Sequence, residues 1–160
     1  VSKGKLALTK FLVLLSCLAI ELLIFFSSFI IAGVIATKIM NVTETIPVFY
    51  LLTWTVKLFV TMVPAIACMW TITVLFEKPL LSMGLNLLLI IPGVLIANTP
   101  LWLMYPYCYS GYVVSDALHT VTTAGTGGTI SLFPFVPCAV IISALALCVS
   151  IKCFGRKEMR

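Results

Sequence analysis

Four long apolar runs dominate the sequence and limit what the chain can fold into. They cover approximately residues 11–36, 56–76, 80–97 and 133–151. Each is close to the roughly 20 residues that an α-helix needs to cross the hydrocarbon core of a bilayer. Lipid offers no partner to free backbone amides, so such runs are expected to cross as helices; the period-2 alternation typical of a β-barrel is absent. The sequence therefore predicts an all-α, polytopic transmembrane helix bundle, with four spans in a single domain over residues 1–160.

The composition agrees with a membrane protein and argues against a nucleic-acid-binding protein. Only 9% of the residues are charged, and the mean hydropathy is +1.22. A soluble domain is about one quarter charged, so the charges here are too few to cover a water-facing surface. The net charge of +5 comes from basic residues that flank the apolar runs. They do not alternate with aromatic residues as in a stacking platform for bases.

The positions of the basic residues predict the topology. One side of the membrane would hold both ends of the chain and the short turn after the second run. Its basic residues are Lys3, Lys5, Lys10, Lys78, Lys152, Arg156, Lys157 and Arg160. The opposite side has Lys38, and Lys57 is expected to snorkel outward beside Trp54. Because an excess of Lys and Arg marks the cytoplasmic side, we predict a multi-pass protein of the plasma membrane with both termini in the cytoplasm.

The segment at residues 98–132 differs from the four runs. It is rich in Trp and Tyr and then in Thr and Gly, and aromatic side chains of this kind suit the membrane–water interface. We expect a short interfacial helix over 101–118, broken near Pro106, and a flexible turn over 122–129. The whole segment is predicted to be external, between the third and fourth spans.

Glu21 is the most distinctive single residue, because it is an acid inside the first apolar run. A charged group at the centre of a bilayer costs about 2.5–3.5 kcal/mol on insertion scales, so it normally faces protein or water. One interpretation is a transport-path or proton-relay group. The other is a protonated or hydrogen-bonded carboxyl packed between helices. Both predict that Glu21 does not face lipid.

Three further positions are candidates for a transport path or for helix packing. Pro64 lies in the second run, and the pair Pro92 and Gly93 lies in the third. Proline removes a backbone donor and can kink a helix at mid-depth. Breaks of this kind form binding sites in some transporters, but a plain packing kink is an equally good interpretation.

The residues indicate no enzyme, metal site or cofactor site. The six cysteines include no CxxC pair, and four of them lie inside apolar runs, where a small buried hydrophobe is the simpler interpretation. Asp116 and His119 lack a visible third ligand. The glycines of residues 125–128 lack the Lys-Ser or Lys-Thr of a phosphate-binding loop.

The order of several softer features resembles a known family. The second run continues as VLFEKPLLSMGL, an aromatic, proline-bearing segment PLWLMYPYCY follows, and the chain closes with KCFGRKEMR. This order is similar to the C-terminal two thirds of an ABC-2 type permease, especially the lantibiotic-immunity and bacitracin-type export permeases. The resemblance covers nearly the whole chain and contains no invariant catalytic motif.

The resemblance implies a permease with six spans, of which the first two would precede Val1. In this family a separate ABC ATPase subunit hydrolyses ATP, the permease has no nucleotide site, and two permease copies form the path. For this chain it implies partners in the bilayer, an ATPase and a second copy. The turn at Glu77 and Lys78 would be a minor contact for the ATPase on the cytoplasmic face.

Two functions remain open at this point. The first is the permease of an exporter that moves a peptide antibiotic or another amphipathic substrate. The second is a non-transporting membrane protein, such as an immunity or assembly factor, that binds a partner in the bilayer. An intramembrane enzyme would need a catalytic set inside the spans, and the sequence contains none. A neighbouring gene for an ATP-binding-cassette protein would distinguish the first two.

Overall fold

The computed structural model describes residues 3–41, 46–76, 78–97, 99–122 and 132–157, and these residues are helical without a strand among them. The long helices are α1 (Lys3–Met40), α2 (Val48–Leu75), α3 (Pro79–Ile96) and α5 (Leu132–Lys157). Between α3 and α5 lie the 3₁₀ helices η1 (Pro100–Met104) and η2 (Pro106–Cys108), and then α4 (Tyr109–Thr122). The helices α1, α2, α3 and α5 are long and apolar enough to cross a membrane. The predicted all-α bundle with four spans is therefore confirmed.

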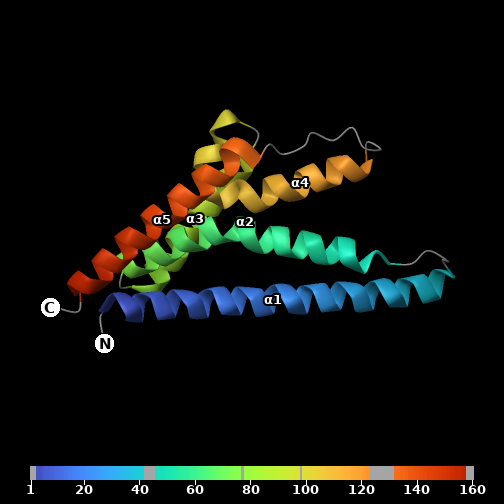
Figure 1. Ribbon diagram of the computed structural model, residues 1–160, viewed down its shortest axis with the longest axis horizontal. Coiled ribbons are helices and arrows are strands. Elements are labelled where there is room, and N and C mark those ends of the chain that lie inside the picture. The colour runs from blue at the N-terminus through green and yellow to red at the C-terminus, as the bar shows by residue number, and fades with distance from the viewer. Residues whose placement is uncertain (1–2, 42–45, 77, 98, 123–131, 158–160) are drawn as a thin grey trace.

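The helices form an elongated bundle around α2. Helix α1 runs along one side of the molecule and α2 returns beside it, whereas α3 and α5 pack on the C-terminal half of α2 (Figure 1). Helix α4 lies beside the N-terminal half of α2 (Figure 1). The start of α1 and the end of α5 lie together at one end of the bundle, where the Lys10 Nζ is 4.9 Å from the centre of the Phe154 ring. The basic flanks thus share one end of the molecule, as the predicted topology requires.

Three of the helices, α1, α2 and α5, are longer than the predicted spans, and α5 runs six residues past the expected end at 151. Helix α1 has 38 residues, which at about 1.5 Å per residue gives a length of about 57 Å. Helix α2 has 28 residues and begins at Val48, eight residues before the predicted start of its span at 56. Both exceed the hydrocarbon thickness of about 30 Å, and such excess is accommodated by tilt or by extension beyond the core.

Proline distinguishes the helices that pack inside the bundle. Pro64, Pro92 and Pro137 lie inside α2, α3 and α5. Each lacks a backbone N–H and clashes with the carbonyl one turn earlier, which bends a helix. Helix α1 contains no proline and runs without a visible bend (Figure 1).

Serine and threonine hydroxyls in the helices are satisfied mainly within their own helix. Ser16 and Ser27, for example, donate to carbonyls one turn earlier at 2.9 and 2.8 Å. Thr71 also reaches a second helix, because its Oγ1 lies 2.8 Å from the Ala67 oxygen in α2 and 2.8 Å from the Ala146 oxygen in α5. This contact ties α2 to α5 where lipid-like surroundings favour interhelical hydrogen bonds.

The segment between α3 and α5 contributes buried side chains to the bundle. Cys108, Tyr109 and Val113 are buried there, against α2, α3 and α5. The helical segment is broken at Tyr105 and Pro106, between η1 and η2, so the expected break near Pro106 is present. Its external position stays a prediction, and the expected turn at 122–129 lies almost wholly outside the described residues.

Candidate functional site

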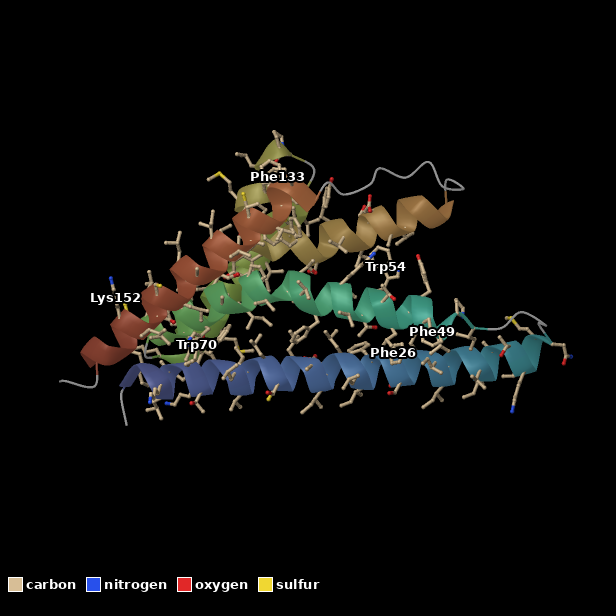
Figure 2. All side chains as sticks on the ribbon, in the orientation of Figure 1. Phe26, Phe49, Trp54, Trp70, Phe133 and Lys152 are labelled. Carbon is tan, nitrogen blue, oxygen red and sulfur yellow. The ribbon has the colours of Figure 1, made fainter. Side chains whose placement is uncertain are left out.

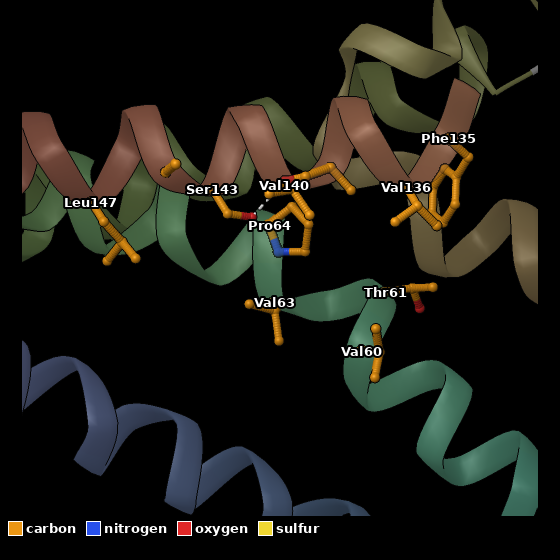
Figure 3. Close-up of a pocket in the computed structure, with 11 residues that line it drawn as sticks. Val60, Thr61, Val63, Pro64, Phe135, Val136, Val140, Ser143 and Leu147 are labelled. Atoms are coloured by element: carbon orange, nitrogen blue, oxygen red, sulfur yellow. Dashed lines mark hydrogen bonds between the residues drawn. The ribbon is translucent and has the colours of Figure 1, made fainter. Parts of the chain in front are cut away.

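The structure contains an open groove between α2 and α5. Its volume is about 420 Å³. Helix α2 contributes Val60, Thr61, Val63 and Pro64, and α5 contributes one face between Phe135 and Leu147 (Figure 3). The lining is almost entirely apolar, so the groove suits a hydrocarbon chain or an apolar side chain better than a polar solute.

The groove follows from a bend and from small side chains. Pro64 is buried at the point where α2 turns (Figure 3), and this bend moves the two halves of α2 to different distances from α5. On the opposite wall, Ala139, Ser143 and Ala144 line the groove. Short side chains on that wall leave space that leucine or phenylalanine would fill.

The two hydroxyls in the groove are already engaged. Thr61 donates to the Leu58 oxygen at 3.0 Å, and Ser143 donates to the Ala139 oxygen at 2.7 Å. A hydroxyl bonded to its own helix offers a ligand only its remaining acceptor capacity. The groove is therefore effectively apolar along its length.

An aromatic cluster closes one end of the groove. It consists of Trp102, Tyr109, Tyr112 and Phe135, and we call it the aromatic joint. Trp102 stacks on Tyr112 with 4.1 Å between ring centres and on Phe135 with 5.8 Å, and Tyr109 meets Phe135 edge-on at 4.9 Å. Phe135 also lines the groove. The groove thus runs from the bend in α2 to a belt of Trp and Tyr, the residues typical of a membrane interface.

Burial makes two tyrosines at or near this joint harder to ionise. It raises the pKa of Tyr109 to about 12, and it raises the pKa of Tyr107 to about 12 as well. The Tyr109 hydroxyl donates to the Leu103 oxygen. Because loss of the proton would leave a phenolate in a desolvated site, these rings act as neutral hydrogen-bond donors rather than as charged groups.

Lys57 lies one helical turn from the groove. It precedes Val60 by three residues, Thr61 by four and Pro64 by seven, a spacing that puts all four on one side of α2. Its Nζ is 4.3 Å from the centre of the Trp54 ring, and Tyr50 meets Trp54 edge-on at 6.1 Å. The expected pairing of Lys57 with interfacial aromatic residues is therefore present.

Gly93, beside Pro92 in α3, faces the segment that follows α3, and a role of either residue in a transport path stays a prediction. A Cβ added to Gly93 would lie 3.5 Å from the Tyr105 ring and 3.6–3.7 Å from the backbone of Tyr107 and Cys108. The Tyr105 hydroxyl donates to the Leu89 oxygen, one turn from Pro92. Gly93 thus lies against Tyr105 and η2, and Pro64 is the predicted candidate that lines the groove.

Glu21 occupies an exposed position on α1 and does not meet the groove. Ala19 and Leu22 line a smaller crevice together with Val56 and Phe59 of α2, so Glu21 lies level with Lys57. The described residues form no ion pair between Glu21 and Lys57, since Lys57 sits over Trp54 on another side of the helix pair. What covers Glu21 in the membrane stays a prediction.

The remaining predicted contact lies at the end of the bundle that holds the chain termini. Lys78 is exposed at the N-cap of α3, and Lys152 projects outward from α5 at the same end (Figure 2). Glu77 lies outside the described residues. Within the part that the structure describes, no three His, Cys, Asp or Glu side chains gather in a way that could hold a metal ion.

Sequence reasoning identified the bend at Pro64 and missed the groove that it creates. In the sequence the opposite wall shows only as Ala139 and Ser143 four residues apart, a spacing of small residues that is typical of close helix packing. Phe135 was not recognised, because nothing in the sequence shows that it meets Trp102. The signal that could have indicated the groove is a proline in one span combined with small residues in another. It can be used only when α2 and α5 are known to be neighbours.

Comparison with known proteins identifies the family. The sequence model described as ABC-2 family transporter protein matches residues 1–93, which include α1, α2 and most of α3. The comparisons with curated proteins and with solved structures each give no match. The match covers more than half of the chain and agrees with the four apolar helices. The chain belongs to the ABC-2 transporter family, whose members are membrane components of transporters.

Proposed function

We propose that the chain is the membrane-spanning permease subunit of an ABC-type exporter that moves a peptide antibiotic or another amphipathic substrate. The family match supports a transporter subunit. The observation that carries the choice of substrate is the apolar groove between α2 and α5, which ends at the aromatic joint. An amphipathic molecule fits an apolar groove that leads to a belt of Trp and Tyr.

The energy would come from ATP hydrolysed on a separate ABC ATPase subunit. The surface offered to that subunit is the end of the bundle with Lys5, Lys10, Lys78 and Lys152. Since an excess of basic residues marks the cytoplasmic side, this end would face the cytoplasm, and α4 would lie toward the outside. A second permease copy would complete the path.

The test is co-purification of the ATPase encoded beside this gene, followed by ATP hydrolysis in the presence and absence of the permease in liposomes. We expect a stable complex in detergent and hydrolysis that rises when an amphipathic peptide is added. A charge-reversed Glu77→Lys should weaken a docking contact, whereas an exchange of Lys78→Arg should not. If no ATPase co-purifies with the full-length gene product, the permease proposal is wrong.

The exposed face of α1 favours a second candidate, a non-transporting immunity or assembly factor. None of the most apolar 18-residue stretch of α1 is buried in the chain, so α1 offers a long surface to a partner in the bilayer. Capture of a membrane peptide without any ATPase, together with protection of cells that lack the exporter, would support this candidate over transport.

A further inference from the structure

We propose that the groove between α2 and α5 holds one hydrocarbon chain of an anionic lipid, with the anionic head at Lys57. This inference deepens the proposed function, and rests on it, because it names the class of amphiphile that enters the groove from the bilayer. Two features carry it: an apolar groove that opens sideways, and a single cation at the end of that groove where the aromatic joint lies.

The groove opens toward the bilayer rather than into the bundle. Val60 and Val140 at its rims are 60% and 61% exposed. A molecule could therefore reach the groove by moving sideways within the hydrocarbon. A lipid chain meets this condition without leaving the bilayer, whereas a polar solute would have to cross it.

The length of the groove matches one leaflet. Its α5 wall extends from Phe135 to Leu147, which at about 1.5 Å per residue spans roughly 18 Å. The hydrocarbon of one leaflet is about half of the 30 Å core, or roughly 15 Å. A single lipid chain that starts near the interface thus reaches the inner end of the groove.

The head of such a lipid would meet Lys57. This lysine lies one turn beyond Thr61, about 6 Å along the helix axis, at the end of the groove toward Trp54. The described acidic side chains, Glu21 and Asp116, form no ion pair with it. The indole of Trp54 covers one side of the ammonium, and a cation over a ring keeps donors for an oxyanion.

An anionic head also explains how a lysine is tolerated at this position. A basic residue inside a membrane segment is costly unless it reaches the interface or pairs with an opposite charge. Among the described residues of α2 and α4, and of α5 up to Val149, Lys57 is the one Lys or Arg. The phosphate of an anionic lipid supplies the missing charge at the depth where the chain begins.

The experiment measures lipid retention by native mass spectrometry of the purified full chain in detergent. The probes are phosphatidylglycerol and phosphatidylcholine with identical chains. Wild type should retain the anionic lipid more strongly. Lys57→Gln should weaken its retention about fivefold, the effect expected for one basic residue near an anionic surface, and should leave phosphatidylcholine unchanged.

A second variant tests the chain separately from the head. Ala144→Leu fills the groove from an exposed position, so it should weaken retention of both lipids. Lys38→Gln and Ala36→Leu are the matched controls on α1, and both should behave as wild type. Size-exclusion profiles and melting temperatures show whether each variant is folded, and only folded variants are compared.

The outcomes separate this inference from the proposed function. An unchanged preference for the anionic lipid in Lys57→Gln, or an equal loss in Lys38→Gln, would overturn the head site. Normal retention in Ala144→Leu would overturn the groove. The lipid assay contains no ATPase, so its result does not depend on the co-purification experiment. If no ATPase co-purifies but the lipid selectivity is present, only the permease proposal is wrong. The reverse pattern would count against the lipid site alone.

Discussion

Helices α1 and α2 are neighbours of similar apolar composition, yet they occupy opposite positions in the bundle. Helix α1 is unbroken and mostly exposed, with Ala7 and Phe11 as its buried hydrophobic residues. Helix α2 bends at Pro64 and contacts all the other α-helices. Hydropathy therefore does not indicate which span is central. The contacts do, because α2 lies against α1, α3, α4 and α5, and its bend at Pro64 leaves a groove beside α5.

This contrast predicts how substitutions will behave. Changes at packed positions of α2, α3 and α5, such as Gly93, should affect folding, because a neighbouring segment lies directly against them. Changes on the outer face of α1 should leave the folding of the chain intact and act only through partners. Position in the bundle, rather than polarity of the residue, should decide the size of the effect.

The largest effect is expected at Gly93 in α3. Gly93→Leu would push a branched side chain into the Tyr105 ring and the backbone of η2, where even a Cβ has neighbours at 3.5–3.7 Å. Overpacking of this kind costs about 1–3 kcal/mol, and the melting temperature in detergent should fall. Gly84→Leu in the same helix is the control, because a Cβ there meets nothing within 4 Å. Equal melting of the two variants would contradict the packing of Gly93.

A smaller effect is expected at Thr71 in α2. Thr71→Val removes the hydroxyl that reaches the Ala146 oxygen in α5, and hydrogen bonds between membrane helices contribute about 0.6 kcal/mol on average, with a maximum near 1.7. Thr73→Val is the control, because the exposed Thr73 donates within its own helix to Met69. If both substitutions change the melting temperature equally, the contact between α2 and α5 contributes nothing.

The third prediction concerns pH and the two buried tyrosines, Tyr107 and Tyr109. The pKa of Tyr107 and that of Tyr109 are raised to about 12 from an ordinary value of about 10. The folded chain thus holds these protons more tightly than the unfolded chain. Stability from this source is complete below pH 10 and is lost as the pH rises from 10 to 12. Phenolate absorbance should show late ionisation in the folded chain, and Tyr109→Phe should remove part of the late phase.

The sequence was sufficient for the spans and insufficient for their register. An apolar run of about 20 residues crosses lipid as a helix, so the four helices could be predicted from the length and composition of the runs. The register of α1 against α2, which places Leu22 and Val56 beside the same crevice, could not be predicted. Two uniformly apolar helix faces can shift along each other without any change in composition. Glu21 was consequently placed by its position in a run, whereas the structure sets it level with Lys57.

The candidate site was predictable only in part for the same reason. Pro64 could be recognised because proline has a fixed effect on any helix. The contacts of Phe135 with Trp102 and of Gly93 with Tyr105 depend on segments far apart in the chain. No local rule contains these pairings, which arise when η1, η2 and α4 fold back onto the bundle.

The smallest effect is expected at Glu21, and it is the sharpest test of the contrast between α1 and α2. Glu21→Gln and Glu21→Leu should melt like the wild-type chain within about 0.5 kcal/mol, as expected for an exposed position. Glu21→Lys should insert less well, because the native acid can take up a proton and become neutral in lipid, whereas lysine keeps its charge more readily. Membrane yield and melting of the three variants are the measurements. A loss of stability in Glu21→Leu as large as that in Thr71→Val would show that Glu21 has a partner within the chain. Helix α1 would then not be an outer helix of the bundle. If Glu21→Gln folds normally but transport falls, the carboxyl acts in the assembled exporter. A substitution that leaves the folding of the single chain unchanged can then act only through a partner that lies against α1.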